Sequence, residues 1–275
     1  VGNSNQEIRE INQWGTNVWT SLSTSFSGCL NLIETATDAP VLTGVNSLSQ
    51  MFLNCTSFNG DLNNWTVTSI QNMSSMFFGC TNFNGNITSW NVTGVTDISQ
   101  MFLGTSFNQD ISGWNVSNVE FMSGTFRNCP FNQDISGWNT SSVQSMRQMF
   151  AGNTSFNQPL NTNAGNWNVS NVTNMERMFN GATAFNQDLN NWDVSEVLTM
   201  ADMFSGATAF NGNISSWTPI KVINMSSMFA DFSGGTMSFN SNISGWNVGS
   251  VTNMAAMFYE SDAFNQDLSG WNISL

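Results

Sequence analysis

The sequence contains no histidine, and only five of its 275 residues are lysine or arginine. Without histidine, neither a Ser-His-Asp triad nor a Cys-His pair can be assembled, and zinc loses its usual nitrogen ligand. The formal net charge of −13 leaves no basic patch to neutralise phosphates, so nucleic acid and anionic membranes are not expected as partners. We therefore expect no enzyme, no catalytic or metal-binding residues and no cofactor.

Long apolar runs are also missing from the sequence. No run approaches the ~18 to 20 residues of a membrane helix, and the N-terminus has no signal-peptide pattern. The chain begins with Val1 instead of Met, which suggests a processed or excised segment. Charged residues make up 8% of the chain and hydrophobic residues 40%, which predicts a large core under a surface of Asn, Ser, Thr and Gly.

What the sequence has in place of these features is a repeat. The stretch at 107–126 reads Phe-Asn-Gln-Asp-Ile-Ser-Gly-Trp-Asn-Val-Ser-Asn-Val-Glu-Phe-Met-Ser-Gly-Thr-Phe, and it returns with variations at 185–204 and 264–275. Its tryptophan recurs every 24 to 29 residues, at Trp65, Trp90, Trp114, Trp138, Trp167, Trp192, Trp217, Trp246 and Trp271. A period of about 20 to 29 residues with fixed hydrophobic positions predicts a solenoid.

Two segments of the repeat predict its secondary structure. Leu62–Val67 has the L-x-x-L-x-L spacing of a leucine-rich-repeat strand, with Trp65 and Val67 on one face. Ile70–Phe77 switches to spacings of three and four, which predict a short helix capped by a hydroxyl such as that of Thr68. We expect a leucine-rich-repeat-like solenoid of ten to eleven coils of about 25 residues, each with a short parallel strand and a short helix. At ~4.8 Å per coil its length would be about 50 Å.

One domain is expected, because each coil of a repeat array contacts only its neighbours. Residues 1–10 form a lead-in and 11–275 form the solenoid, with degenerate coils at 11–52 and regular coils at 53–275. The sequence stops within a repeat, so we expect an uncapped C-terminal end. A second copy covering that end would build an open head-to-tail filament.

An asparagine follows the second phenylalanine of every regular coil. Stacked ~4.8 Å apart, these asparagines are expected to hydrogen-bond to one another and to the turn backbone as a ladder, at ~1 kcal/mol net per bond. The ladder residues are Asn59, Asn84, Asn108, Asn132, Asn157, Asn186, Asn211, Asn240 and Asn265.

Trp167–Leu189 reads Trp-Asn-Val-Ser-Asn-Val-Thr-Asn-Met-x-x-Met-Phe-x-Gly-Ala-x-x-Phe-Asn-Gln-Asp-Leu, and the chain opens its repeats with Trp14-Gly15-x-x-x-Trp19. These units resemble the BspA-like leucine-rich repeat surface proteins, whose repeats were first catalogued as a mycoplasma lipoprotein domain of unknown function. The resemblance runs from about Ile11 to the end, with Pro40 standing where a tryptophan is expected. It implies an extracellular or cell-surface solenoid for adhesion and binding, without catalytic residues to carry over.

A row of acidic residues lies two positions after the ladder, at Asp61, Asp110, Asp134, Asp188 and Asp267. Other coils have asparagine there, so we expect the row to cap turn amides. Calcium bridging the adjacent Asp110 and Asp134 is the alternative.

Two arginines are expected to form modest ion pairs between coils, Arg147 with Glu176 and Arg177 with Asp202. Paired surface acids are formally open to glycosidase chemistry. Repeats make rows of side chains and not a unique pocket, however, so we favour no site of that kind.

The four cysteines share one position of the coil, at Cys29, Cys55, Cys80 and Cys129, where other coils have Ala182 or Ala207. The position therefore favours a small buried side chain. A Cys29–Cys55 disulfide between consecutive coils and a row of free thiols both remain open.

The tryptophan row could be an exposed platform for sugars, but its alternating apolar position favours the core. The outward positions beside it form a polar face, which we take as the candidate binding face: Thr66, Thr68, Asn91, Thr93, Asn115, Ser117, Asn139, Ser141, Asn168 and Ser170. Two insertions, Asn161–Asn166 and Asp231–Ser238, break the period and are further candidates for specificity.

The function that we expect is adhesion, or protein or glycan interaction, at the cell surface or outside the cell. The alternative is a structural subunit that assembles end to end into a filament, and ice binding by the regular polar face is a distant third. Sequons are frequent and would be acceptors for N-glycosylation in a eukaryotic secretory context, at Asn64, Asn91, Asn115, Asn139, Asn168 and Asn272.

Overall fold

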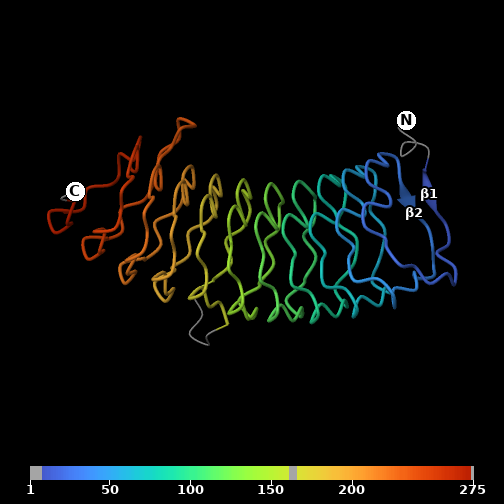
Figure 1. The fold of residues 1–275 in the computed structure, drawn as a ribbon. Helices are drawn as coiled ribbons and strands as arrows, with labels where there is room; N and C mark the ends of the chain where they lie inside the picture. The colour runs from blue at the N-terminus through green and yellow to red at the C-terminus, as the bar shows by residue number, and fades with distance from the viewer. Residues whose placement is uncertain (1–7, 161–165, 274–275) are drawn as a thin grey trace.

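The computed structural model describes residues 8–160 and 166–273. The chain winds into an elongated solenoid whose coils lie side by side from the N-terminal to the C-terminal end (Figure 1). Two strands are formed in these ranges, β1 (Glu10–Ile11) and β2 (Ile33–Glu34), which pair in parallel with Glu10 opposite Ile33. Beyond them, isolated parallel bridges join neighbouring coils in a continuous column from Ser47 to Asn253.

The helix predicted for each coil is not formed anywhere in the described ranges. In 70–80 the backbone amides alternate between two kinds of hydrogen bond. One set donates to the next coil, as from Ser75 N to Ser99 O (2.8 Å). The other set donates to the oxygen three residues earlier and closes a turn, as from Met76 N to Met73 O (3.2 Å). Ser75 has a φ of 55°, a left-handed conformation that ends any helix. Successive turns bury side chains at spacings of three and four as a helix would, which explains why the pattern was misleading.

The strand predicted at Leu62–Val67 is likewise a turn, closed by a hydrogen bond from Trp65 N to Leu62 O (3.0 Å). The oxygen of Leu62 also accepts the indole N–H of Trp90 in the following coil (2.8 Å), so a side chain makes the contact that a strand partner would make. The predicted alternation nevertheless holds, because Trp65 and Val67 are buried while Thr66 and Thr68 are exposed.

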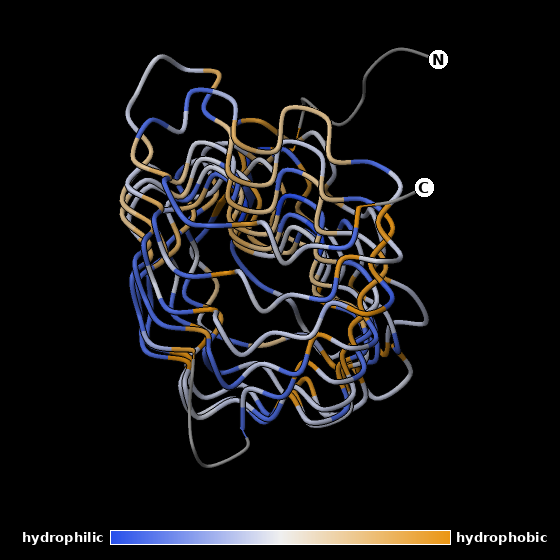
Figure 2. Ribbon diagram, turned by 90° about the vertical axis from the view of Figure 1, so that its left-hand side faces the viewer, coloured by the Kyte–Doolittle hydropathy of each residue, from blue (hydrophilic) through white to orange (hydrophobic). Residues whose placement is uncertain are grey.

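The core consists of stacked rows of identical side chains along the solenoid, and residues of like hydropathy lie behind one another when it is viewed end-on (Figure 2). Phe77 stacks on Phe52 of the preceding coil with ring centroids 5.8 Å apart and on Phe83 of its own coil at 3.8 Å. The tryptophans from Trp65 to Trp246 are all buried, so the row is core and not an exposed platform.

All four cysteines are free, buried thiols in the structure. The Sγ of Cys80 donates to the backbone oxygen of Phe52 at 2.8 Å, and the Sγ of Cys55 donates to that of Phe26 at 2.9 Å. Burial raises the pKa of the Cys55 thiol to about 12, so the thiolate is strongly disfavoured. The cysteine position is thus a packing position.

Candidate functional site

The candidate binding face lies at the surface, but some of its side-chain oxygens are already engaged in hydrogen bonds within the chain. Asn91 and Asn139 are exposed, yet the Oδ1 of each accepts the backbone N–H two residues later, at 3.1 Å in both cases. The same turn is made by Asn115 (3.2 Å) and Asn168 (2.9 Å). The face therefore offers hydroxyls and amide N–H groups to a ligand, while its amide oxygens are engaged.

The other outward residues of this face differ in exposure. Thr66, Thr68 and Thr93 are exposed, whereas Ser117, Ser141 and Ser170 are half-buried. Thr66 and Thr68 line a shallow hollow of about 500 Å³ together with residues 39–43 of the preceding coil.

The asparagine ladder runs through the structure as eight consecutive hydrogen bonds of 2.7 to 3.0 Å. In each, the Oδ1 of one asparagine accepts the backbone N–H of the next, as from Asn157 to Asn132 (3.0 Å). The neighbouring glutamine adds a second bond, as from Gln158 Nε2 to the backbone oxygen of Asn132 (3.0 Å). The ladder therefore fixes the register of the coils.

The acidic row caps turns. The Oδ1 of Asp110 accepts the backbone N–H of Ser112 at 2.9 Å, and this bond holds the pKa of Asp110 below its usual range. Asp134 receives the backbone N–H of Ser136 in the same way at 2.8 Å. In the part of the chain that the structure describes, no three His, Cys, Asp or Glu side chains gather where they could hold a metal ion.

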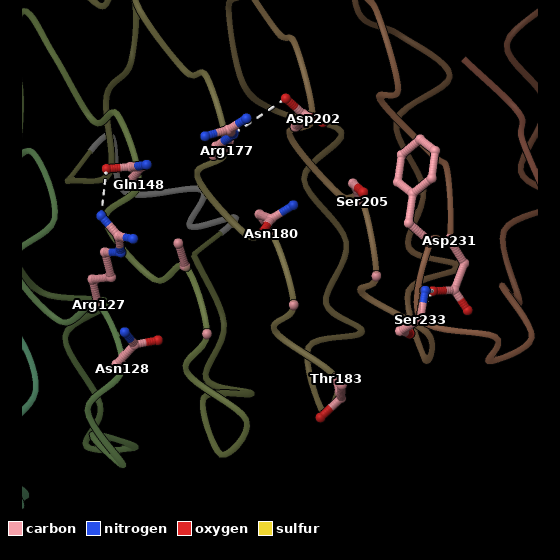
Figure 3. Close-up of a pocket in the computed structure, with 15 residues that line it drawn as sticks. Arg127, Asn128, Gln148, Arg177, Asn180, Thr183, Asp202, Ser205, Asp231 and Ser233 are labelled. Carbon is pink, nitrogen blue, oxygen red and sulfur yellow. Dashed lines mark hydrogen bonds and ion pairs between the residues drawn. The ribbon is translucent and has the colours of Figure 1, made fainter. Parts of the chain in front are cut away.

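The structure adds a site that sequence reasoning missed: a groove of about 640 Å³ across five coils, at the turns that follow the Met-Phe positions (Figure 3). We call it the turn-row groove. Ten of its fifteen lining residues have polar side chains, and the full lining comprises Arg127, Asn128, Gln148, Ala151, Gly152, Arg177, Asn180, Gly181, Thr183, Asp202, Ser205, Gly206, Asp231, Phe232 and Ser233.

Glycines keep the turn-row groove open. Gly152, Gly181 and Gly206 occupy one position in consecutive coils, with φ of 66°, 67° and 69°, a region that costs other residues free energy. Asn128 takes the same position one coil earlier, and its Oδ1 lies only 2.0 Å from where a Cβ on Gly152 would stand. A side chain at Gly152 would therefore have to displace the Asn128 amide and adopt a strained left-handed backbone.

Arginines concentrate at the N-terminal end of the turn-row groove. Arg127 Nη1 donates to Gln148 Oε1 at 3.1 Å, and the same oxygen accepts Arg147 Nη1 at 3.3 Å. Both predicted ion pairs are present, Arg147 with Glu176 at 3.1 Å and Arg177 with Asp202 at 3.2 Å.

Arg127 differs from the other two arginines, because no carboxylate of the described residues lies within 4 Å of it. Three of the five cationic residues of the chain thus stand on three consecutive coils, and one of them has no acidic partner there.

The insertion Asp231–Ser238 closes the other end of the groove. Asp231 is buried, donates its backbone N–H to Tyr259 O (2.9 Å) and accepts the N–H of Ser233 on Oδ1 (2.8 Å). Burial alone would raise the pKa of Asp231, but hydrogen bonds from Ser233 and Gly235 hold it below its usual range. The charged carboxylate therefore anchors a built loop.

This loop presents an aromatic side chain. Phe232 is 62% exposed and stacks on Tyr259, with ring centroids 5.0 Å apart and planes 15° from parallel. The other predicted insertion, Asn161–Asn166, lies outside the described residues except for Asn166.

Guanidinium, amide and hydroxyl groups can hydrogen-bond a ligand, and an exposed ring beside them can pack against its apolar part. The sequence held a signal for this site, since three arginines within 127–177 are an anomaly in so acidic a chain. That two of them, Arg127 and Arg177, line one groove could be seen only once the turns were placed.

Comparison with known proteins gives one match. The sequence model of a family described as "Mycoplasma protein of unknown function, DUF285" matches residues 2–106, 78–164, 105–201 and 160–271, in four overlapping stretches. Neither a curated protein nor a solved structure matches the chain. Within the described ranges, no helix has the length and apolarity needed to cross a bilayer.

Proposed function

Because the chain belongs to this DUF285 family of repeat proteins, whose function is unknown, we propose that it is a non-enzymatic protein of the cell surface or extracellular space that mediates adhesion. It would do so as a BspA-like, leucine-rich-repeat-like scaffold that binds a protein or a glycan. The observation that carries the proposal is the turn-row groove, a recognition surface on an otherwise regular solenoid.

The physical support is the division of labour among the residues. Aromatic, Met and Asn rows hold the coils together, and the Asp row caps the turns. What is left for a partner is the polar outer surface, the groove and the loop carrying Phe232. A rigid, elongated frame that displays such a surface suits attachment, because many weak contacts along its length add up.

The test is an adhesion assay with the whole chain coupled to beads. Beads carrying the folded chain are expected to be retained on a surface coated with extracellular-matrix proteins and glycans, whereas beads carrying urea-unfolded chain or albumin are not. Equal retention of all three would refute adhesion as a property of the folded solenoid. The end-to-end filament and ice binding remain predictions, which electron microscopy and thermal-hysteresis measurements address.

A further inference from the structure

We infer that the turn-row groove binds an extended acidic glycan, with a sugar carboxylate on Arg127 and a sugar ring on Phe232. The inference rests on the proposed function and gives it a ligand class. It also places the specific contact in the turn-row groove and not on the polar face that the sequence predicted.

The first step is the state of Arg127. Its Nη1 is engaged by the neutral oxygen of Gln148 at 3.1 Å, and no carboxylate of the described residues lies within 4 Å. A guanidinium carries five N–H donors in a planar fork that matches a carboxylate with two parallel bonds. Arg127 can therefore receive a carboxylate from outside while Gln148 holds it in place.

The second step is the charge density of the ligand. Two arginines line the groove, Arg127 and Arg177, and they are matched in number by Asp202 and Asp231, while the whole chain carries −13. A densely charged polyanion would be repelled by this surface. A chain with an occasional carboxylate among neutral units is repelled less, and its carboxylate can reach Arg127, which has no carboxylate partner among the described residues.

The third step is shape. The groove is open and polar, crosses five coils and repeats similar groups from coil to coil, among them Asn128, Asn180, Thr183 and Ser205. An extended oligosaccharide presents hydroxyls at intervals comparable with the rise of a coil. The groove lacks the deep apolar pocket that a peptide side chain would need as an anchor.

The fourth step is the aromatic end. Phe232 is 62% exposed beside the groove and is supported from behind by Tyr259 at 5.0 Å. The free face of such a supported ring can pack against the C–H face of a sugar ring, which is apolar. Arg127 and Phe232 thus mark the two ends of one ligand.

Calorimetric titration of the full chain with a hyaluronan hexasaccharide, in which alternate sugars carry a carboxylate, tests the inference. We expect saturable binding that R127Q weakens about tenfold, the loss of one charge-assisted pair. F232A should weaken it severalfold. K221Q removes one positive charge from an exposed ion pair with Glu196 outside the groove, so it is the matched control and should bind like the unchanged chain.

Three results would overturn the inference: no binding of the hexasaccharide, equal losses in R127Q and K221Q, or equally tight binding of the uncharged chitin hexasaccharide. Thermal melting of each variant verifies that it folds. The bead assay separates the two claims. Retention of R127Q and F232A beads at the unchanged level would remove the groove from adhesion and leave the proposed function, whereas loss of retention by the unchanged chain would remove the proposed function itself.

Discussion

The indole Nε1 of Trp138 donates a hydrogen bond of 3.1 Å to the backbone oxygen of Ile111, one coil earlier. The same bond recurs in neighbouring coils, as from Trp114 to Ile87 (3.3 Å) and from Trp167 to Ile135 (2.7 Å). Tryptophan at this position therefore does more than fill space, since its indole N–H adds a second hydrogen bond, from the next coil, to an oxygen that already accepts a backbone N–H within its own turn.

Replacing Trp138 with phenylalanine should cost about 1 to 3 kcal/mol of unfolding free energy, because it leaves a cavity and removes one of the two hydrogen bonds that the Ile111 oxygen accepts. Urea titration followed by circular dichroism measures the change. The control is W271F, since Trp271 makes the same bond to Ile243 (3.0 Å) but is only partly buried, and its loss should be clearly smaller. Equal losses would contradict the packing argument.

The asparagine ladder predicts a difference between two substitutions at Asn132. Alanine removes the oxygen that accepts Asn157 N–H (3.0 Å) and Gln158 Nε2 (3.1 Å) and should cost about 1 to 2 kcal/mol, whereas aspartate at neutral pH still accepts both bonds. Hydrogen exchange at the Asn157 amide reports on the first of these bonds alone. We expect faster exchange in N132A and nearly unchanged exchange in N132D; unchanged exchange in N132A would show that the ladder contributes nothing at this coil.

The thiol row predicts protection from reagents. At pH 8 none of the four cysteines should react with a disulfide reagent such as DTNB while the chain is folded, because all are buried and the pKa of Cys129, for example, is raised to about 11 by burial. All four should react after unfolding in urea without any reductant. If only two react, a Cys29–Cys55 disulfide has formed in solution and the free-thiol description of that pair is wrong.

Glu34 predicts a dependence of stability on pH. Burial raises its pKa from 4.5 to about 7, with Asp61 and Asp38 adding to the effect, while a hydrogen bond from Trp14 Nε1 (2.8 Å) opposes it. The folded chain then keeps a proton that the unfolded chain releases, so the stabilisation is complete below about pH 4.5 and is lost as the pH rises through 7.

The substitution E34Q mimics the neutral carboxyl and should remove this dependence. At pH 8 the variant is expected to exceed the unchanged chain in unfolding free energy by roughly 2 kcal/mol after allowance for solvent screening, and to match it at pH 4.5. Urea midpoints at both pH values measure this. The control E196Q, at the exposed ion pair with Lys221, should show no such gain at pH 8.

The sequence was enough to predict which residues form the buried rows, but it was not enough to predict the backbone conformation of each coil. The period placed Trp65, Met73 and Phe77 correctly in the core, because burial depends on spacing alone. The helix prediction was wrong because turns closed three residues apart give the same spacing, and positive φ at residues such as Gln50 and Ser75 has no signature in the sequence. Hydrogen bonds to the next coil replace those that a helix would make within itself.

The turn-row groove escaped prediction for a related reason. A hollow arises where side chains are absent, and Gly152, Gly181 and Gly206 look like ordinary turn residues in the sequence. Their alignment on one edge depends on the stacking of coils. The C-terminal end of the groove depends on Asp231, whose hydrogen bonds with Ser233 and Tyr259 shape the inserted loop.

The direction of the asparagine bonds has a mechanical consequence. Each ladder bond runs between neighbouring coils, so a force that pulls the two ends apart loads every rung in series and spares contacts within the remaining coils. The weakest coil peels away first and releases roughly 80 Å of slack, the extended length of about 25 residues. We therefore expect a solenoid built in this way to lengthen stepwise under load while its remaining coils stay folded.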